Sequence, residues 1–391
     1  MNLDRDLERI REDFPLLKQK VYLNSAAVGP LMLPVWNAIK EYWESRLSGA
    51  RLTPPKAKAE AAKMLGAKET EIAWVSRVVQ SFNMIRSMID FEPGDNVVVT
   101  DLAYPSNVHT WLPIRSKGAE VRRVENNGGD IETADFEKAV DDHTKVVSIS
   151  HTEWASGITY DLKVLADVAH DHGAFVAVDA YQSLGAVKID APEADVDFLF
   201  SGATKWLCCD TGAGIFYVRG DLIEGLEPYY QYYGLVEEAF KGGAAWGREE
   251  HDNIRDWDKA IVRDASRFEQ GTVTETDIIG LHAALRYFNE LGMENIERRV
   301  KKLSGYLIDG LRDLGCRVNT PLEPERRAGL VTYHTGSHEL NKRSVEELGK
   351  GNIVVSLRYT GGIGGVRAAT HFFNTEEEID RLLKAQKVLL K

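Results

Sequence analysis

Short apolar runs without polar alternation recur along the first two thirds of the chain. They are rich in Val, Ile and Phe, a composition typical of strands that are buried on both faces. We therefore predict buried strands at the following segments: Asn96–Thr100, Val146–Ser150, Ala174–Val178, Asp197–Phe200 and Gly214–Val218.

Amphipathic stretches separate several of these predicted strands. The stretch 161–172 places four apolar residues at helical spacing, namely Leu162, Leu165, Ala166 and Ala169. Gly173 follows at a position where helix ends favour glycine. Strands that alternate with such helices predict an α/β fold, with a mainly parallel sheet covered on both faces. The alternation extends over about residues 21–260.

The last third of the chain has a different pattern. Helical periodicity predicts long helices over 276–291 and 294–314, and apolar runs predict short strands over 329–335 and 353–358. Thr375 is a favourable N-cap for a final helix, and three glutamates follow it near the positive helix end. These elements predict a smaller α+β domain.

The two patterns suggest a division of the chain into three parts. We expect residues 1–20 to form an N-terminal arm that packs with the small domain, residues 21–270 to form the large domain, and residues 271–391 to form the small C-terminal domain.

Composition narrows the class of protein. The chain has 391 residues, of which 43% are hydrophobic and 28% are charged, values typical of a folded globular protein. Its net charge of −12 disfavours nucleic acid as a partner. No apolar run reaches the roughly 18 residues that span a bilayer, and the charged N-terminus lacks a signal-peptide core. Three cysteines are too few for a disulfide framework. We expect a cytoplasmic enzyme with no membrane partner.

Two residues carry a specific chemical signal. Asp179 ends an apolar strand, at the sheet edge where open α/β folds bind ligands, and Lys205 follows the next predicted strand. A lysine amine that forms a Schiff base and a carboxylate that keeps a pyridine nitrogen protonated are what pyridoxal phosphate chemistry requires. Taken alone, the two residues would more often be a turn aspartate and a surface lysine, so the surrounding motifs decide between these interpretations.

Seven ordered motifs support the functional interpretation: Tyr22–Ala27, Asp101–Asn107, Ser150–Gly157, Val178–Ala186, Lys205–Leu207, Phe268–Thr272 and Val366–Asp380. With them, nearly the whole chain resembles the class V aminotransferase family, which includes cysteine desulfurases and isopenicillin N epimerase-like proteins. The resemblance implies a fold-type I pyridoxal-phosphate-dependent enzyme with a seven-stranded sheet in the large domain. It also implies a homodimer with shared active sites and a small amino acid as substrate.

The resemblance assigns roles around the cofactor. Lys205 matches the Schiff-base lysine and Asp179 the partner of the pyridine nitrogen. Gln182 matches the residue that hydrogen-bonds the cofactor's phenolic oxygen or the internal aldimine, and Tyr104 matches the aromatic residue stacked on the ring. Thr272 matches a residue that reaches the phosphate of the neighbouring subunit. For each of these residues the alternative is an ordinary structural polar group.

The phosphate-binding loop departs from the family pattern. Where the family has a Gly-Thr-Thr-like loop, this chain has valines, Val78 and Val79, which leave only backbone N–H groups at the start of a helix. The missing hydroxyls would have to be replaced by Ser201, Thr204 or Arg77.

On the substrate side, the resemblance implies four contacts. Arg367 matches the arginine that binds the substrate α-carboxylate, a task suited to its planar fork. Arg358, Asn24 and Trp154 match positions around the same substrate. No pattern predicts a metal site.

Two departures bear on the reaction. The segment from Arg358 to Gly365 contains no cysteine where some desulfurases carry their mobile thiol, and Cys208, Cys209 and Cys316 lie elsewhere. Trp154 stands where desulfurases tend to have Asn. The glycines of 361–365 suggest a flexible loop beside the active site.

These features favour C–S lyase or β-elimination chemistry over a persulfide-forming desulfurase. A class V aminotransferase, an amino-acid epimerase and a catalytically reduced scaffold that binds the cofactor are alternatives that the sequence leaves open.

Overall fold

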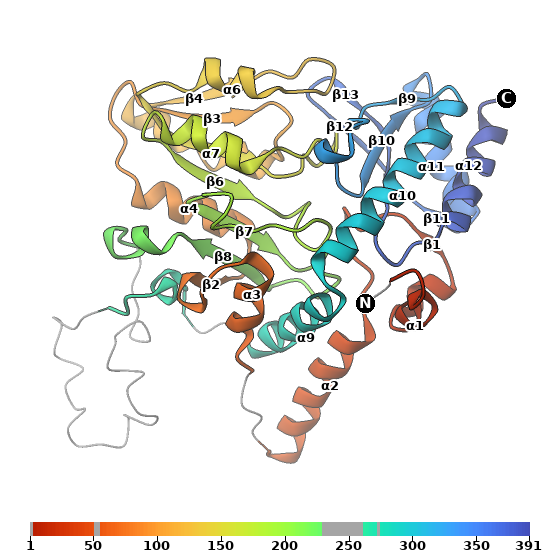
Figure 1. Cartoon of the computed structure of the whole chain (residues 1–391), viewed down its shortest axis with the longest axis horizontal. Coiled ribbons are helices and arrows are strands. Elements are labelled where there is room, and N and C mark those ends of the chain that lie inside the picture. Colours follow the sequence, from red (N-terminus) through yellow and green to blue (C-terminus); the bar gives the residue numbers. More distant parts are fainter. Residues whose placement is uncertain (1–2, 51–54, 229–260, 272–273) are drawn as a thin grey trace.

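The computed structural model describes residues 3–50, 55–228, 261–271 and 274–391. A seven-stranded sheet occupies one side of the molecule and a four-stranded sheet the other, with the long helix α10 (Met293–Asp313) running between them in Figure 1. A two-stranded sheet joins the beginning of the chain to its last third. The α/β architecture agrees with the sequence prediction.

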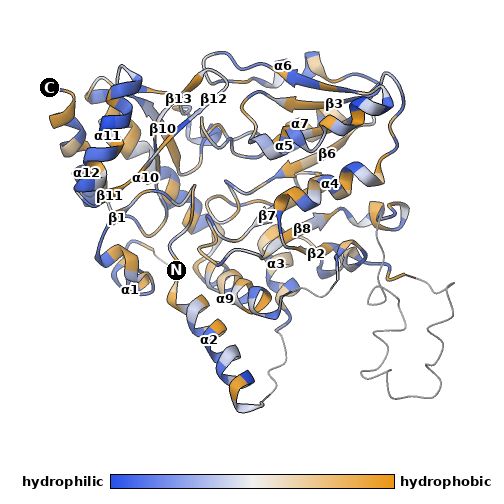
Figure 2. Cartoon of the chain, turned by 180° about the vertical axis from the view of Figure 1, so that it is seen from behind, coloured by the Kyte–Doolittle hydropathy of each residue, from blue (hydrophilic) through white to orange (hydrophobic). Residues whose placement is uncertain are grey.

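The large sheet has the strand order β2-β8-β7-β6-β5-β3-β4. Its strands are β2 (Ile72–Val75), β3 (Asn96–Thr100), β4 (Glu120–Val124), β5 (Thr144–Ser150), β6 (Phe175–Asp179), β7 (Phe198–Gly202) and β8 (Gly214–Val218). β8 runs antiparallel to both of its neighbours, β2 and β7, whereas β3, β4, β5, β6 and β7 pair in parallel, so the carboxyl ends of β5, β6 and β7 lie at one edge. Figure 2 shows the apolar β3 beside the more polar edge strand β4.

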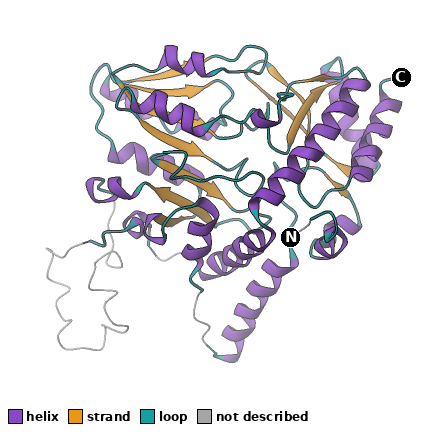
Figure 3. Ribbon diagram, in the orientation of Figure 1, coloured by secondary structure: helices purple, strands orange, loops and turns teal. Residues whose placement is uncertain are grey.

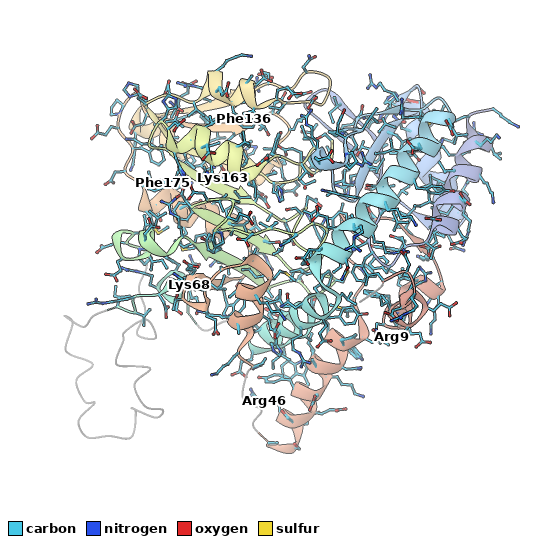
Figure 4. The ribbon with its side chains drawn as sticks, viewed as in Figure 1. Arg9, Arg46, Lys68, Phe136, Lys163 and Phe175 are labelled. Carbon is cyan, nitrogen blue, oxygen red and sulfur yellow. The ribbon has the colours of Figure 1, made fainter. Side chains whose placement is uncertain are left out.

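Helices cover both faces of this sheet, as Figure 3 shows. The helices of this part are α2 (Leu33–Ser48), α3 (Ala57–Leu65), α4 (Val78–Met88), α5 (Pro105–His109), α6 (Thr133–Ala139), α7 (Leu162–His170) and α9 (Glu275–Leu291). The face covered by α7 contains Phe136, which packs edge-to-face on Tyr160 at 5.5 Å (Figure 4). The opposite face, covered by α4, contains Phe175, which packs on Phe198 at 5.8 Å.

The predicted helix over 161–172 illustrates why the sequence folds this way locally. The Asp161 side chain accepts hydrogen bonds from the N–H groups of Lys163 and Val164, which caps α7. The four apolar residues singled out from the spacing are all buried. Burial of this stripe fixes the helix against the sheet.

The small sheet has the order β12-β13-β10-β9 and is antiparallel. Its strands are β9 (Arg317–Val318), β10 (Leu330–His334), β12 (Ser356–Thr360) and β13 (Ile363–Ala369), and β1 (Val21–Tyr22) pairs separately with β11 (Ile353–Val354). Its remaining helices are α11 (His338–Lys350) and α12 (Glu376–Leu389). Thr375 caps α12 as expected.

The N-terminal segment lies against this last helix. In α1 (Leu7–Glu12), Arg11 donates to the Phe373 carbonyl oxygen at 2.7 Å and pairs with Glu378 at 2.8 Å. The domain boundaries given above stay a prediction.

The glycine-rich segment 361–365 forms a tight hairpin rather than a loop, so that expectation was wrong. Gly361 and Gly362 occupy the left-handed region at φ 52° and 77°, as a two-residue hairpin turn requires, and β13 begins directly after them at Ile363. In the described part of the chain, no helix is long and apolar enough to cross a membrane.

Candidate active site

Asp179 ends β6, between Ser150 of β5 and Phe200 of β7. Its side chain is buried and accepts a hydrogen bond from the Tyr181 N–H at 2.9 Å. Burial raises the pKa of this carboxyl to about 6, although the Tyr181 N–H and the nearby Lys205 charge oppose the shift. Asp179 therefore presents a carboxylate that lacks an ion-pair partner among the described residues.

Lys205 follows β7 and reaches the same sheet edge. Its Nζ lies 4.0 Å from the centroid of the Tyr181 ring and 5.7 Å from that of Tyr104. The pKa of the amine is lowered to about 8, mainly by burial; the Asp179 charge opposes this shift, and the charges of Arg367 and Arg358 add to it. A substantial fraction of such an amine is neutral near pH 8, as a nucleophile or proton acceptor must be.

The backbone at Thr204 and Lys205 is held against the N-terminal segment. The Gly29 N–H donates to the Thr204 carbonyl oxygen at 2.7 Å, and a Cβ at Gly29 would lie 2.0 Å from the Lys205 carbonyl oxygen. Only glycine permits this approach. It fixes the backbone from which the lysine side chain projects.

Gln182 lies in the site, with its amide fully oriented by the protein. Its Nε2 donates to the Ala26 carbonyl oxygen at 3.1 Å, and its Oε1 accepts from Trp206 Nε1 at 2.9 Å. One N–H of the amide remains for a ligand. Tyr104 is the N-cap residue of α5, half exposed, and packs edge-to-face on Trp154 at 5.4 Å and 88°.

Arg367 and Arg358 share one face of the small sheet. Arg367 pairs in register with Ser356, and Arg358 pairs with Gly365, so the two arginines are diagonal neighbours on adjacent antiparallel strands. The Arg367 side chain is 2% exposed, and burial together with the Arg358 charge lowers its pKa to about 9. Neither arginine has a carboxylate partner within the described ranges, a costly arrangement unless a ligand supplies the anion.

Among the enclosed polar atoms that have no hydrogen-bond partner in the described structure, three belong to the predicted substrate-binding residues: Asn24 Oδ1, Trp154 Nε1 and Arg367 Nε. Asn24 forms a bridge with Ala369, two residues after Arg367 on the same strand, and the Trp154 carbonyl oxygen accepts from Arg367 Nη1. Buried polar groups are normally paired, and these three atoms gather around Arg367, where they are available to a polar ligand.

The predicted phosphate site lies at the start of α4. Val78 and Val79 are its first residues, and their N–H groups have no acceptor among the described residues. The Ser201 hydroxyl is directed at the carbonyl oxygens of Ala180 (3.4 Å) and Gly202 (3.2 Å), and Thr204 is buried. Thr272 lies outside the described residues.

Two residues of the site were not singled out from the sequence. Tyr181 forms the aromatic surface next to Lys205, although it lies between Asp179 and Gln182 in a motif that was already noted. Glu153 is fully buried, accepts from Thr100 Oγ1 at 2.6 Å, and has its pKa raised to about 8 by burial. The sequence feature that could have pointed to Glu153 is its position directly before Trp154, in a motif that was already noted.

A separate cleft of about 810 Å³ lies elsewhere, lined by His151, Asp161, Lys301 and Arg326 among others. None of the predicted site residues lines it. We therefore locate the active site from the chemistry of its side chains and not from the presence of this cleft.

The residues present fit a pyridoxal phosphate cofactor. A buried carboxylate and a lysine of lowered pKa lie at the carboxyl edge of a mainly parallel sheet, and a buried arginine without an anion lies on the small sheet, where its charge lowers the pKa of that lysine. This combination defines a pyridoxal-phosphate-dependent enzyme of the fold-type I class.

Comparison with known proteins gives the family. Residues 21–382 match the family model described as aminotransferase class-V. A probable cysteine desulfurase of Methanothermobacter thermautotrophicus is 29% identical over 407 aligned positions, which cover 96% of each chain. The chain belongs to the class V aminotransferase family.

Solved structures share the fold. The apo cysteine desulfurase from Thermococcus onnurineus NA1 superposes with a TM-score of 0.85 at 26% identity, over 98% of both chains. The cystine C–S lyase C-DES, in complex with cysteine persulfide, gives 0.83 at 22% identity over 96% of this chain and 99% of that one.

Proposed function

We propose that this chain is a C–S lyase that acts by β-elimination on a small sulfur-containing α-amino acid and forms no persulfide on a cysteine of its own. Bound pyridoxal phosphate supplies a covalent attachment for the substrate amine and a ring that withdraws electrons from the α-carbon. The relatives named as cysteine desulfurases and the neighbour named as a cystine C–S lyase support a sulfur amino acid as substrate.

The state of the cysteines is the observation that carries this proposal. Cys208, Cys209 and Cys316 are all buried, and burial raises the pKa of each thiol: to about 12 for Cys209 and to about 11 for Cys316. Because the thiolate is the reactive form, none of them is suited to accept sulfur. The hairpin at 361–365 contains no cysteine.

In this proposal, each site residue has a defined task. Lys205 holds the cofactor and moves the α-proton, and Asp179 keeps the ring nitrogen protonated. The other cofactor contacts are Gln182, Tyr104, Val78, Val79, Ser201, Thr204 and the partner subunit's Thr272. Arg367, with Arg358, Asn24 and Trp154 around it, binds the α-carboxylate and leaves the Cβ–S bond to be broken.

Product analysis tests the reaction. Elimination converts cysteine and water into pyruvate, ammonia and hydrogen sulfide, whereas sulfur transfer to an enzyme thiol yields alanine. We expect pyruvate from the holoenzyme, and equal pyruvate from a variant with all three cysteines replaced by alanine. Alanine production that disappears in this variant would contradict the proposal. Amino transfer dependent on a keto acid, or racemisation, would favour the aminotransferase or epimerase alternatives.

We also propose that two copies of the chain assemble with shared active sites. The helix α2 extends from the body of the molecule (Figure 1) and exposes three large apolar side chains along one face: Trp36, Trp43 and Leu47. Their exposed fractions are 51%, 53% and 88%. An exposed apolar stripe of this kind is typical of an interface.

A further inference from the structure

The hairpin between β12 and β13 reaches from the small sheet to the part of the molecule built around the large sheet. Gly361 and Gly362 form its turn, and Ile363 directly after them is only 5% exposed. Ile363 belongs to the same hydrophobic cluster as Leu102, which follows β3, and Ile149 of β5. This end of the hairpin therefore shares a core with the large sheet.

One amide group connects the turn to the loop that follows β3. Asn126 Nδ2 donates to the Gly361 carbonyl oxygen at 2.8 Å and to Asp101 Oδ2 at 2.6 Å. Asn126 Oδ1 accepts from the Gly129 N–H at 2.7 Å, and the Asn126 main-chain N–H donates to Asp101 Oδ1 at 3.1 Å. Because both side-chain N–H groups and the oxygen have partners, the orientation of this amide is fixed.

The contact at the turn is close as well as polar. A Cβ at Gly361 would lie 2.9 Å from Asn126 Nδ2 and 2.9 Å from Leu102 Cδ2, so a side chain there would have to displace both groups. Gly362 has the same left-handed φ, but a Cβ at this position would meet no described atom within 4 Å. Backbone conformation favours glycine at both positions, whereas the close approach requires it only at Gly361.

These contacts join two segments that each carry residues of the active site. Asp101 lies three positions before Tyr104, whose ring is 5.7 Å from Lys205 Nζ. On the other side of the contact, Arg358 of β12 and Arg367 of β13 are held in one hairpin by the register of the two strands. The position of the turn therefore determines where these arginines lie relative to Lys205.

We propose that Asn126 is a positioning residue for substrate binding, which holds the hairpin turn against the loop after β3 and thereby keeps Arg358 and Arg367 in place for the α-carboxylate. The hydrogen bond from Arg367 to the Trp154 carbonyl oxygen is a second connection between the same parts of the molecule. Loss of Asn126 should therefore displace the turn and Arg358 without releasing the whole small sheet. This inference rests on the proposed function only through the carboxylate site.

Glycine and methylamine, which differ by the carboxylate, separate placement of the arginines from other effects. Each compound is titrated into the holoenzyme, and binding is followed by the visible absorbance of the cofactor. For Asn126→Ala we expect the Kd of glycine to rise roughly three- to tenfold, as for loss of one hydrogen bond, and the Kd of methylamine to stay unchanged. Asn126→Asp keeps the shape but directs an oxygen at Asp101 and the Gly361 carbonyl, so it should raise the Kd of glycine at least as much.

Matched controls are available for the amide and for the turn. Asn289 Nδ2 also donates to a carbonyl oxygen and a carboxylate, both of Glu60, at 3.0 Å and 2.7 Å, so Asn289→Ala removes the same kind of contact between α9 and α3. Gly361→Ala should weaken glycine binding selectively, as Asn126→Ala does. Gly362→Ala introduces the same backbone strain without the close contact. We expect Asn289→Ala and Gly362→Ala to leave both Kd values unchanged.

A double variant tests whether Asn126 acts through Arg358. In a protein that already carries Arg358→Gln, Asn126→Ala should cause little further rise in the Kd of glycine, because residues that act as a unit are not additive. Additive losses, an unchanged Kd of glycine in Asn126→Ala, or an equal rise for glycine and methylamine would each overturn the positioning role. A wild-type holoenzyme whose absorbance responds to neither compound would instead refute the proposed function.

Discussion

Arg367 Nη1 donates a hydrogen bond to the main-chain carbonyl oxygen of Trp154 at 2.7 Å. This contact leaves Nε and Nη2, the two N–H groups along one edge of the guanidinium, for a ligand. Arg367 Nε is enclosed and has no acceptor among the described residues. That edge is the one that pairs with a carboxylate through two parallel bonds, so the Trp154 carbonyl orients the guanidinium as binding of the proposed α-carboxylate would require.

Arg367→Lys should weaken binding of an α-amino acid while it keeps the positive charge. Lysine lacks the planar fork, and loss of one charge-assisted hydrogen bond costs about 1.5–3 kcal/mol. We expect kcat/KM to fall roughly tenfold or more, since about 1.4 kcal/mol is a factor of ten. Amines that correspond to the substrate without its carboxylate should react equally poorly with both proteins. An unchanged kcat/KM for amino acids would reopen the substrate class.

Asp179→Asn should stabilise the cofactor-free protein at neutral pH and still abolish most activity. The carboxyl pKa is about 6 in the fold and about 4 in an unfolded chain, so the fold favours the protonated form. Stability is therefore lost as pH rises from about 4 to about 6, by about 2–3 kcal/mol in all. The uncharged amide introduced by Asp179→Asn does not lose stability as pH rises, but it cannot keep the pyridine nitrogen of the cofactor protonated.

Urea unfolding of the stripped proteins at pH 7 and pH 4 measures this effect. The free energy of unfolding of Asp179→Asn should exceed that of the wild-type protein at pH 7 and be nearly equal to it at pH 4. The exposed Asp171→Asn should change stability little at either pH. A gain of the same size at both pH values would show that the carboxylate charge is not its cause.

Local pattern was sufficient for much of the fold. The strands at 96–100 and 214–218 have the predicted bounds, because an uninterrupted apolar run between turn residues has few other solutions. The predicted strand 353–358 divides into β11 and β12, because its first residues pair with β1 rather than with the small sheet. Pairing partners are a property of the whole chain, which periodicity does not report.

Prediction of the active site meets the same limit, because local sequence does not report contacts between distant residues. Motifs were enough to propose Lys205, Asp179 and Arg367, since each stands in a distinctive local sequence. The contact between Arg367 and the Trp154 carbonyl joins residues 213 positions apart and depends on how the two sheets meet. The hairpin at 361–365 was missed because glycines serve mobile loops and tight turns equally, and only the φ angles distinguish them.

The rate of cofactor attachment should rise with pH up to about 8. Lys205 attacks only as the neutral amine, and its pKa of about 8 makes that form a minority at pH 7. Stopped-flow absorbance of stripped protein mixed with pyridoxal phosphate should give a midpoint near this value, and Lys205→Ala should show no covalent step.

Arg358→Gln should move this midpoint upward, because the Arg358 charge is one cause of the lowered lysine pKa. The mixing experiment is otherwise identical. A midpoint near 10 in the wild-type protein would mean that Lys205 is solvated like an ordinary lysine.

Two inactive variants should restore activity when mixed, if each active site takes Thr272 from the partner chain. Lys205→Ala removes the attachment point in its own chain, and Thr272→Ala removes a contact from its partner's site. A mixed dimer then has one site that carries both changes and one site that carries neither.

Co-refolding the two chains should recover activity in proportion to the mixed dimer, whereas simple addition of two inactive homodimers gives none before exchange. Lys205→Ala paired with Asp179→Asn is the matched control, because those changes lie in separate sites of a mixed dimer and leave neither intact. Sedimentation of a fully active monomer would contradict the shared site, and so would recovery that is equal in both pairings.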